Sequence, residues 1–179
     1  MSKFEKSFYK LISYSRSKIT LNIFNFITNI EDSIYILPYL YLGNINSSSD
    51  IEFLNSKNIT SIVNCSCDIP FNDYFKDKNM FRLKINDDKE TENIKKFEED
   101  ILKTIKFIDY EITNKRPVLV HCYFGLMRSA TVIGCYLIIK YKMSVEDAIH
   151  LLKKKNAFTF NSHYNFIEVL NNVHEKFNT

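Results

Sequence analysis

The chain has 179 residues, of which 45% are hydrophobic, 15% aromatic and 25% charged, and its formal net charge is +3. This balance is typical of one globular domain with a sizeable core, and it excludes a disordered tail, a collagen-like repeat and a coiled-coil rod. The charge is too weak and too dispersed to indicate nucleic-acid binding, and no apolar run reaches the roughly 18 to 20 residues of a membrane span.

An amphipathic helix is predicted over residues 3–15, where apolar residues recur at helical spacing. The residues that form this stripe are Phe4, Phe8, Leu11 and Ile12. We predict that residues 1–31 form an N-terminal extension and that residues 32–179 form the main domain.

The next run, Ser33–Leu42, is β-branched and aromatic, and Pro38 inside it predicts an edge strand or a broken strand. A turn at Gly43-Asn44 closes this run. Ser48 or Ser49 is the predicted cap of a short helix that continues to Asn58.

The rest of the chain alternates strands with helices. Strands are predicted at residues 59–63, 81–85 and 117–121, with a surface loop over residues 65–80. Four helices are predicted, and the apolar spacing of residues 94–112 indicates the first. The second covers residues 130–141, the third begins with a capping box at Ser144 and Asp147 and ends at about Lys154, and the last lies around residues 166–173. This alternation predicts an α/β fold with a mostly parallel sheet covered by helices.

A phosphate-binding loop is predicted in the segment VLVHCYFGLMRS, residues 118–129. A buried strand ends at Cys122, five residues turn, and Arg128 opens an apolar helix, so that successive backbone N–H groups point into one concavity. Gly125 supplies a turn conformation that a side chain would resist, and the Arg128 guanidinium can hold two phosphate oxygens at once. Besides Arg128, the predicted phosphate-binding residues are Tyr123, Phe124, Gly125, Leu126 and Met127.

The same loop predicts a catalytic nucleophile. Its N–H groups and the helix dipole stabilise a thiolate, so Cys122 is expected to be ionised at neutral pH and to attack phosphorus. Ser129 can donate its hydroxyl to the sulfur and help the thiolate leave when a phosphocysteine is hydrolysed. We expect His121 to fix the loop by hydrogen bonds and to favour the thiolate, rather than to act as a general base.

The motif HCYFGLMRS resembles the H-C-x-x-G-x-x-R-S signature of cysteine-dependent protein phosphatases, and its context resembles their dual-specificity branch. The resemblance covers roughly residues 32 to 175, through LYLGN, ITSIVN and INDD. It implies a tyrosine-phosphatase-like fold with about five strands and phosphorylated proteins as partners. It also implies hydrolysis of phosphotyrosine and of phosphoserine or phosphothreonine through a phosphocysteine, with no metal and no cofactor.

The reaction also needs a carboxyl group that protonates the leaving oxygen and later deprotonates water. The family carries it on a loop upstream of the signature, and Asp87 occupies the matching place, thirty-five positions before Cys122. Asp88 is the alternative. An aspartate beyond a strand is also a common turn residue, so a purely structural role stays open.

Some positions depart from the family pattern. Phe124, Leu126 and Met127 are larger and more apolar than is usual in this loop, which predicts narrower access or a preference for an aromatic substrate. Phe160-Asn161 stands where Pro-Asn is common. The chain has no extra segment to build a deep phosphotyrosine cleft, so a shallow pocket that also admits phosphoserine and phosphothreonine is our hypothesis.

The N-terminal SFYKLISYSRS also resembles the start of the poxvirus virion phosphatases of this branch, in which an N-terminal helix exchanges between protomers. This resemblance and the apolar stripe predict a homodimer through the N-terminal helix, and a virion location if the chain is viral.

The four cysteines do not predict a disulfide scaffold, and no secretory signal is apparent, so we expect a reducing compartment such as the cytoplasm. Some relatives form a disulfide between the nucleophile and a cysteine in the region of Cys65 and Cys67. A regulatory disulfide with Cys122 is therefore open beside the simpler interpretation of both as structural residues.

Two other functions stay open. RNA 5′-phosphatases and phosphoinositide phosphatases have related folds, but extra Lys or Arg would be expected in the loop, and residues 123–127 contain none. A catalytically weak phosphopeptide-binding module typically loses its cysteine, whereas Cys122, Arg128 and Ser129 are all present.

Overall fold

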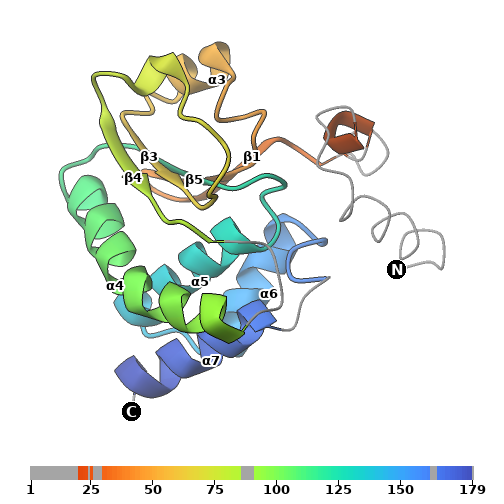
Figure 1. The fold of residues 1–179 in the computed structure, drawn as a ribbon, viewed down its shortest axis with the longest axis vertical. Coiled ribbons are helices and arrows are strands. Elements are labelled where there is room, and N and C mark those ends of the chain that lie inside the picture. Colours follow the sequence, from red (N-terminus) through yellow and green to blue (C-terminus); the bar gives the residue numbers. More distant parts are fainter. Residues whose placement is uncertain (1–19, 24, 26–29, 86–90, 162–164, 179) are drawn as a thin grey trace.

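A computed structural model of the chain describes residues 20–23, 25, 30–85, 91–161 and 165–178 (Figure 1). The predicted helix over residues 3–15 and the candidate acids Asp87 and Asp88 therefore lie outside the described residues. Within the described ranges, no helix is long and apolar enough to cross a membrane.

A five-stranded sheet forms the centre of the molecule, and three of its four strand pairs are parallel. The strands, in their order across the sheet, are β1 (Ser33–Leu37), β2 (Leu40–Gly43), β5 (Val118–His121), β3 (Ser61–Asn64) and β4 (Asn79–Arg82). The predicted mostly parallel sheet is confirmed. The register aligns the last residues of the four parallel strands, Gly43, His121, Asn64 and Arg82, and we refer to this side as the carboxyl edge.

Pro38 divides the predicted strand at residues 33–42 into the antiparallel hairpin β1–β2. Leu37 pairs with Leu40 across the turn, and Tyr39 has a positive φ of 66°. Proline has no N–H to donate to a strand ladder, so the break falls where the sequence predicts it, and β1 is an edge strand.

Helices cover both faces of the sheet (Figure 1). One face is covered by α4 (Thr91–Thr113), α5 (Arg128–Tyr141), α6 (Val145–Lys155) and α7 (Asn165–Asn178). The other face carries α3 (Ile51–Ser56) and the short 3-10 helix η1 (Asp73–Phe75). Along β5, Val118 and Val120 belong to the large core under α4–α7, and Leu119 belongs to the smaller core on the other face. Both faces of β5 are thus buried, as its continuous apolar sequence predicts.

Three local predictions differ from the structure. Asp50 caps α3 by accepting a hydrogen bond from Phe53 N at 3.0 Å, whereas the hydroxyls of Ser48 and Ser49 both donate to the carbonyl of Ile45. β4 covers Asn79–Arg82 rather than residues 81–85, because pairing with β3 sets its limits. The predicted loop at residues 65–80 contains η1, whose Phe75 is fully buried.

A buried carboxylate, Glu111 near the end of α4, ties this helix to the amino ends of two strands. Its side chain is 2% exposed and accepts hydrogen bonds from Ser61 Oγ at 2.5 Å, Arg116 Nε at 2.6 Å and Asn79 Nδ2 at 3.0 Å. A second bond joins Arg116 Nη2 to the other carboxylate oxygen at 2.9 Å. Burial alone would raise the pKa of Glu111, but these hydrogen bonds together lower it below its usual value.

We expect Glu111→Gln to lower the free energy of unfolding by about 2 to 3 kcal/mol at pH 7, because the buried donors lose a charged acceptor. A lowered folded-state pKa means that this stabilisation is present above the unfolded-state value of about 4.3 and is lost as the pH falls through the folded value. The difference between the two proteins should therefore shrink below about pH 4. Urea unfolding at several pH values checks this, with Glu99→Gln on the exposed side of α4 as the control. A pH-independent difference would contradict it.

Candidate active site

Cys122 follows directly after β5 at the carboxyl edge, and it is 2% exposed. Two hydrogen-bond donors point at its sulfur: the backbone N–H of Gly125 at 3.3 Å and the hydroxyl of Ser129 at 3.2 Å. Both donors stabilise negative charge on the sulfur, and neither can accept a proton from it. The contact predicted between Ser129 and the sulfur is thus present.

The loop between Cys122 and Arg128 has the backbone conformation that the motif predicts. Gly125 has a φ of +73°, a region that other residues rarely adopt, and a Cβ atom there would lie 2.9 Å from the carbonyl oxygen of Gly43. The first residue of α5 is Arg128, and its N-cap, Met127, makes no side-chain capping hydrogen bond. The first N–H groups of α5 are therefore oriented for an anion at the helix N-terminus.

Arg128 is also 2% exposed and lies between this loop and the chain that follows β4. Its Nη1 donates to the carbonyl oxygen of Ile85 at 3.4 Å, a long contact. Ile85 ends the described range 30–85, and Asp87 comes two positions later in the sequence. The guanidinium is therefore held next to the chain that leads to the candidate acid.

The apolar residues of the loop divide into two groups. Leu126 and Met127 are buried in the large core, and Phe124 is only partly buried against it. The rings of Tyr123 and Phe124 meet edge to face, with centroids 5.0 Å apart. The predicted effect of Leu126 and Met127 on access is therefore wrong, because their side chains pack into the core. Phe124 is only partly buried, so its predicted effect on access or on substrate preference stays a prediction.

His121 is buried at the end of the central strand, and it is neutral. Burial lowers its pKa to about 3; the nearby charges of Arg82 and Arg128 lower it further, and an approach of the Cys122 backbone opposes the shift only in part. Neither ring nitrogen has a hydrogen-bond partner of ordinary geometry in the described part of the chain. The hydrogen bonds predicted for His121 are thus not made there, and a neutral imidazole supplies no positive charge to the sulfur.

Cys65 and Cys67 differ in their relation to Cys122. Asn64 pairs with His121 and Cys65 N donates to His121 O at 2.8 Å, so Cys65 and Cys122 leave neighbouring strands side by side. Cys65 is buried, and burial and then the charge of Cys122 raise its pKa well above the usual value for a thiol, while Arg128 opposes this. Cys67 is exposed. Of the two, Cys65 is the one that these contacts bring beside Cys122, and the disulfide stays a prediction.

Three polar side chains hold the loop after β3, and no sequence motif marked them as part of a site. Asn64 Nδ2 donates to Ile69 O at 2.8 Å, Ser66 Oγ donates to Asn64 Oδ1 at 2.6 Å, and Arg82 Nη1 donates to Ser66 O at 2.9 Å. Asn64 and Arg82 are each the last residue of a parallel strand. That position was the available signal, because the carboxyl ends of parallel strands are where such folds place their sites.

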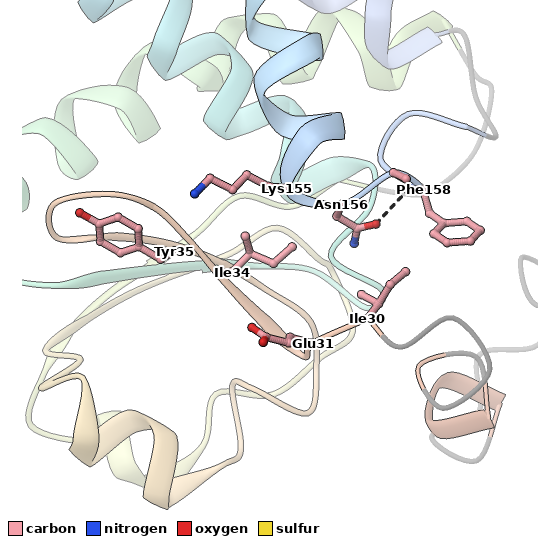
Figure 2. A pocket seen from close by; sticks show the side chains of 8 residues that line it. Ile30, Glu31, Ile34, Tyr35, Lys155, Asn156 and Phe158 are labelled. Carbon is pink, nitrogen blue, oxygen red and sulfur yellow. Dashed lines mark hydrogen bonds between the residues drawn. The ribbon is translucent and has the colours of Figure 1, made fainter.

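A pocket of about 500 Å³ lies between β1 and the turn that follows α6. Figure 2 shows Tyr35 and Lys155 at one end of it and Ile30 and Phe158 at the other, with Asn156 accepting a hydrogen bond from Phe158 N at 3.0 Å. Two residues further along this turn, Phe160 N donates to Leu126 O at 3.2 Å. The turn that forms one wall of the pocket thus continues into a contact with the loop around Cys122.

Comparison with known proteins agrees with this geometry. A family model described as dual specificity phosphatase, catalytic domain, matches residues 40–176. The chain is 36% identical over 125 residues to dual specificity protein phosphatase 2 of Mus musculus, covering 68% of this chain and 37% of that protein. It is 33% identical over 136 residues to dual specificity protein phosphatase 9 of Homo sapiens, covering 75% of this chain and 34% of that protein.

The chain therefore spans about a third of the length of these curated relatives. Among solved structures, human DUSP28 matches with a TM-score of 0.74 and 20% identity, over 83% of this chain and 97% of that one, which shows the shared fold. The range that the family model matches contains the whole strand, loop and helix around Cys122. The chain belongs to the dual specificity phosphatase catalytic-domain family.

Proposed function

We propose that this chain hydrolyses phosphate monoesters of phosphorylated proteins, both phosphotyrosine and phosphoserine or phosphothreonine, through a phosphocysteine intermediate. The observation that carries the proposal is the sulfur of Cys122 with two donors pointing at it, from Gly125 and Ser129, at the uncapped start of α5. A sulfur in this setting is suited to be an anion, and the helix start is suited to bind the phosphate that the anion attacks. Membership of the family supports the same activity.

In the proposed reaction, Cys122 Sγ attacks phosphorus and the bond between phosphorus and the substrate oxygen breaks. Asp87 protonates that oxygen, or Asp88 in the alternative assignment, while Arg128 and the loop N–H groups hold the remaining phosphate oxygens. The same carboxylate then takes a proton from water, which attacks the phosphocysteine. The bond between sulfur and phosphorus breaks, inorganic phosphate leaves, and the Ser129 hydroxyl stabilises the departing thiolate.

The substrate class is tested with matched peptides that carry phosphotyrosine, phosphoserine or phosphothreonine, beside 5′-phosphorylated RNA and phosphoinositides. We expect turnover of all three peptides. In a shallow pocket, the short side chains of phosphoserine and phosphothreonine reach the sulfur as well as the longer phosphotyrosine does. Steady-state kcat/KM for each substrate is the measurement. Activity on phosphotyrosine alone would reject the shallow pocket, and faster turnover of RNA ends or inositol lipids would replace phosphoproteins as the substrate class.

The general acid is tested by Asp87→Asn and Asp88→Asn. We expect Asp87→Asn to lower kcat on a phosphoserine peptide by about 10² to 10³, and Asp88→Asn to change it by less than about threefold. The loss should be smaller on para-nitrophenyl phosphate, whose leaving group needs less protonation. If Asp88→Asn loses more kcat than Asp87→Asn, Asp88 is the general acid instead. If neither variant loses kcat, neither aspartate is the general acid.

The alternatives are disfavoured by the composition of the loop and by its contacts. Residues 123–127 contain no Lys or Arg that would recognise the additional phosphates of RNA ends or inositol lipids. A module that only binds phosphopeptides does not need a hydroxyl that donates a hydrogen bond to a cysteine sulfur. In this chain, Ser129 Oγ donates to Cys122 Sγ. The geometry therefore favours catalysis over binding alone.

The remaining predictions concern assembly and location. The homodimer rests on the apolar stripe of residues 4–12, together with the weak resemblance to virion phosphatases. A reducing compartment such as the cytoplasm is supported by the four cysteines, which are all free thiols. The division at residue 31, the dimer and a virion location stay predictions.

A further inference from the structure

A cluster of side-chain amides surrounds Asp32, the residue before β1. Its carboxylate oxygen Oδ1 accepts hydrogen bonds from Asn25 Nδ2 at 2.5 Å, Asn44 Nδ2 at 2.5 Å and Asn46 Nδ2 at 3.1 Å. The backbone adds a fourth contact, because Asn44 N donates to Asp32 O at 3.0 Å. One half-buried carboxylate thus fixes the turn that follows β2.

Asn44 connects Asp32 to the turn at residues 44–47 by hydrogen bonds. Its Oδ1 accepts hydrogen bonds from Asn46 N at 2.9 Å and from Ser47 N at 3.1 Å, and Ser47 Oγ accepts one from Asn44 N at 3.0 Å. Asn44 is 2% exposed, so water cannot replace a partner that its amide loses. The orientation of the Asn44 side chain, and with it the path of residues 44–47, therefore depends on Asp32.

The turn at residues 44–47 is in direct contact with the loop that carries the candidate nucleophile. Ile45 N donates to Tyr123 O at 3.1 Å, and Tyr123 is the residue after Cys122. On the next turn of that loop, a Cβ atom at Gly125 would lie 2.9 Å from Gly43 O and 3.4 Å from Asn44 N. The peptide groups on both sides of Phe124 therefore rest on the backbone of residues 43–45.

We propose that Asp32 is a positioning residue for the phosphate-binding loop, an inference that rests on the proposed function. Asp32 acts through Asn44 and the Ile45 N–H, which hold the Tyr123 carbonyl and so keep the Gly125 N–H directed at the sulfur. Catalysis and anion binding both depend on such placement, since a shift of about 1 Å can cost about a hundredfold in rate. The carboxylate is suited to this role because one charged oxygen accepts several strong hydrogen bonds at once.

The test compares Asp32→Ala and Asp32→Asn in the full chain. Vanadate is an analogue of the phosphoryl group in the transition state, so its inhibition constant or its direct binding reports the anion affinity of the loop. A phosphotyrosine peptide gives kcat and KM. We expect Asp32→Ala to bind vanadate about tenfold more weakly and to lose kcat more than KM. Asp32→Asn keeps an oxygen acceptor and should restore vanadate affinity to within about threefold of the wild type.

Glu111→Gln is the matched control, because it removes a buried carboxylate at the amino edge of the sheet, opposite the site. It should lower the thermal midpoint while leaving vanadate affinity unchanged. If Asp32→Ala does not fold, Asn46→Ala carries the test: it removes one of the three amide donors and should weaken vanadate binding by about twofold to threefold.

Unchanged vanadate affinity in a folded Asp32→Ala protein would overturn the proposal. So would an equal loss of affinity in Glu111→Gln, since the effect would then follow stability alone. A wild-type chain that binds vanadate but hydrolyses no phosphopeptide would reject the proposed function, while the Asp32 variants would still decide the positioning role. A wild-type chain that does not bind vanadate would overturn both.

Discussion

Replacing Cys122 with serine is expected to abolish phosphatase turnover, with a loss in kcat of at least about 10⁴. The contacts of the sulfur explain the size of this effect. Gly125 N and Ser129 Oγ are both placed as donors, so a serine hydroxyl at this position finds an environment that stabilises an anion but no group that removes its proton. The sulfur of a cysteine is intrinsically the stronger nucleophile, whereas a serine hydroxyl needs an adjacent base to activate it.

The measurement is single-turnover and steady-state hydrolysis of a phosphotyrosine peptide, together with binding of that peptide. Cys122→Ser should retain binding, because Arg128 and the loop N–H groups remain. Cys67→Ser is the matched control: it makes the same change at an exposed cysteine after β3 and should leave kcat unaltered. Residual turnover above about a hundredth of the wild-type rate in Cys122→Ser would reject the phosphocysteine mechanism, and equal inactivity of both wild type and variant would indicate a binding module.

Replacing Arg128 with lysine is expected to lower kcat/KM by about 10² to 10³, although the charge is kept. The guanidinium is nearly fully buried, and its Nη1 donates to the carbonyl of Ile85 at 3.4 Å, so the group has little room to reorient. Lysine offers a point charge that cannot bond two phosphate oxygens in a fixed plane. The loss should appear in vanadate affinity as well as in kcat, because the transition state carries more charge on these oxygens than the substrate does.

Arg116→Lys is the control for this change. Arg116 also holds a carboxylate with two nitrogens, but it does so at the amino edge of the sheet. We expect Arg116→Lys to lower stability and to leave kcat/KM within about twofold. Arg128→Lys retaining more than half of the wild-type kcat/KM would contradict a bidentate role for this arginine.

The strand, loop and helix around Cys122 were predictable from the sequence because all the parts are contiguous. The apolar strand, the Gly at the third loop position and the Arg that opens the helix lie within twelve residues, so local backbone preferences decide their geometry. The long helix α4 was predictable for a similar reason, since apolar residues repeat every three or four positions over residues 94–112.

Side-chain environments were less predictable. Leu126 and Met127 are large and apolar, which predicted that they narrow access to the phosphate-binding loop. Both side chains instead pack into the core under α4–α7, which buries more apolar surface. His121 was expected to donate hydrogen bonds, but its place at the end of a central strand removes water and most polar partners, so the ring is neutral. Asp50 rather than Ser48 or Ser49 caps α3, because the two hydroxyls bond to Ile45 O.

By itself, the amino-acid sequence determined the residues and the local backbone path of the candidate site, because a cysteine, five turning residues and an arginine at a helix start are contiguous in the chain. Only the tertiary structure decided which distant residues support that site. The strand order places β2 and β3 on either side of β5, so Asn44 and Cys65, some 60 to 80 residues away in the chain, come to lie beside the loop. The β1–β2 hairpin likewise brings Asp32, just before β1, next to Asn44, just after β2. Local preferences act over a few residues, whereas strand pairing joins segments whose separation leaves no periodic signal in the sequence.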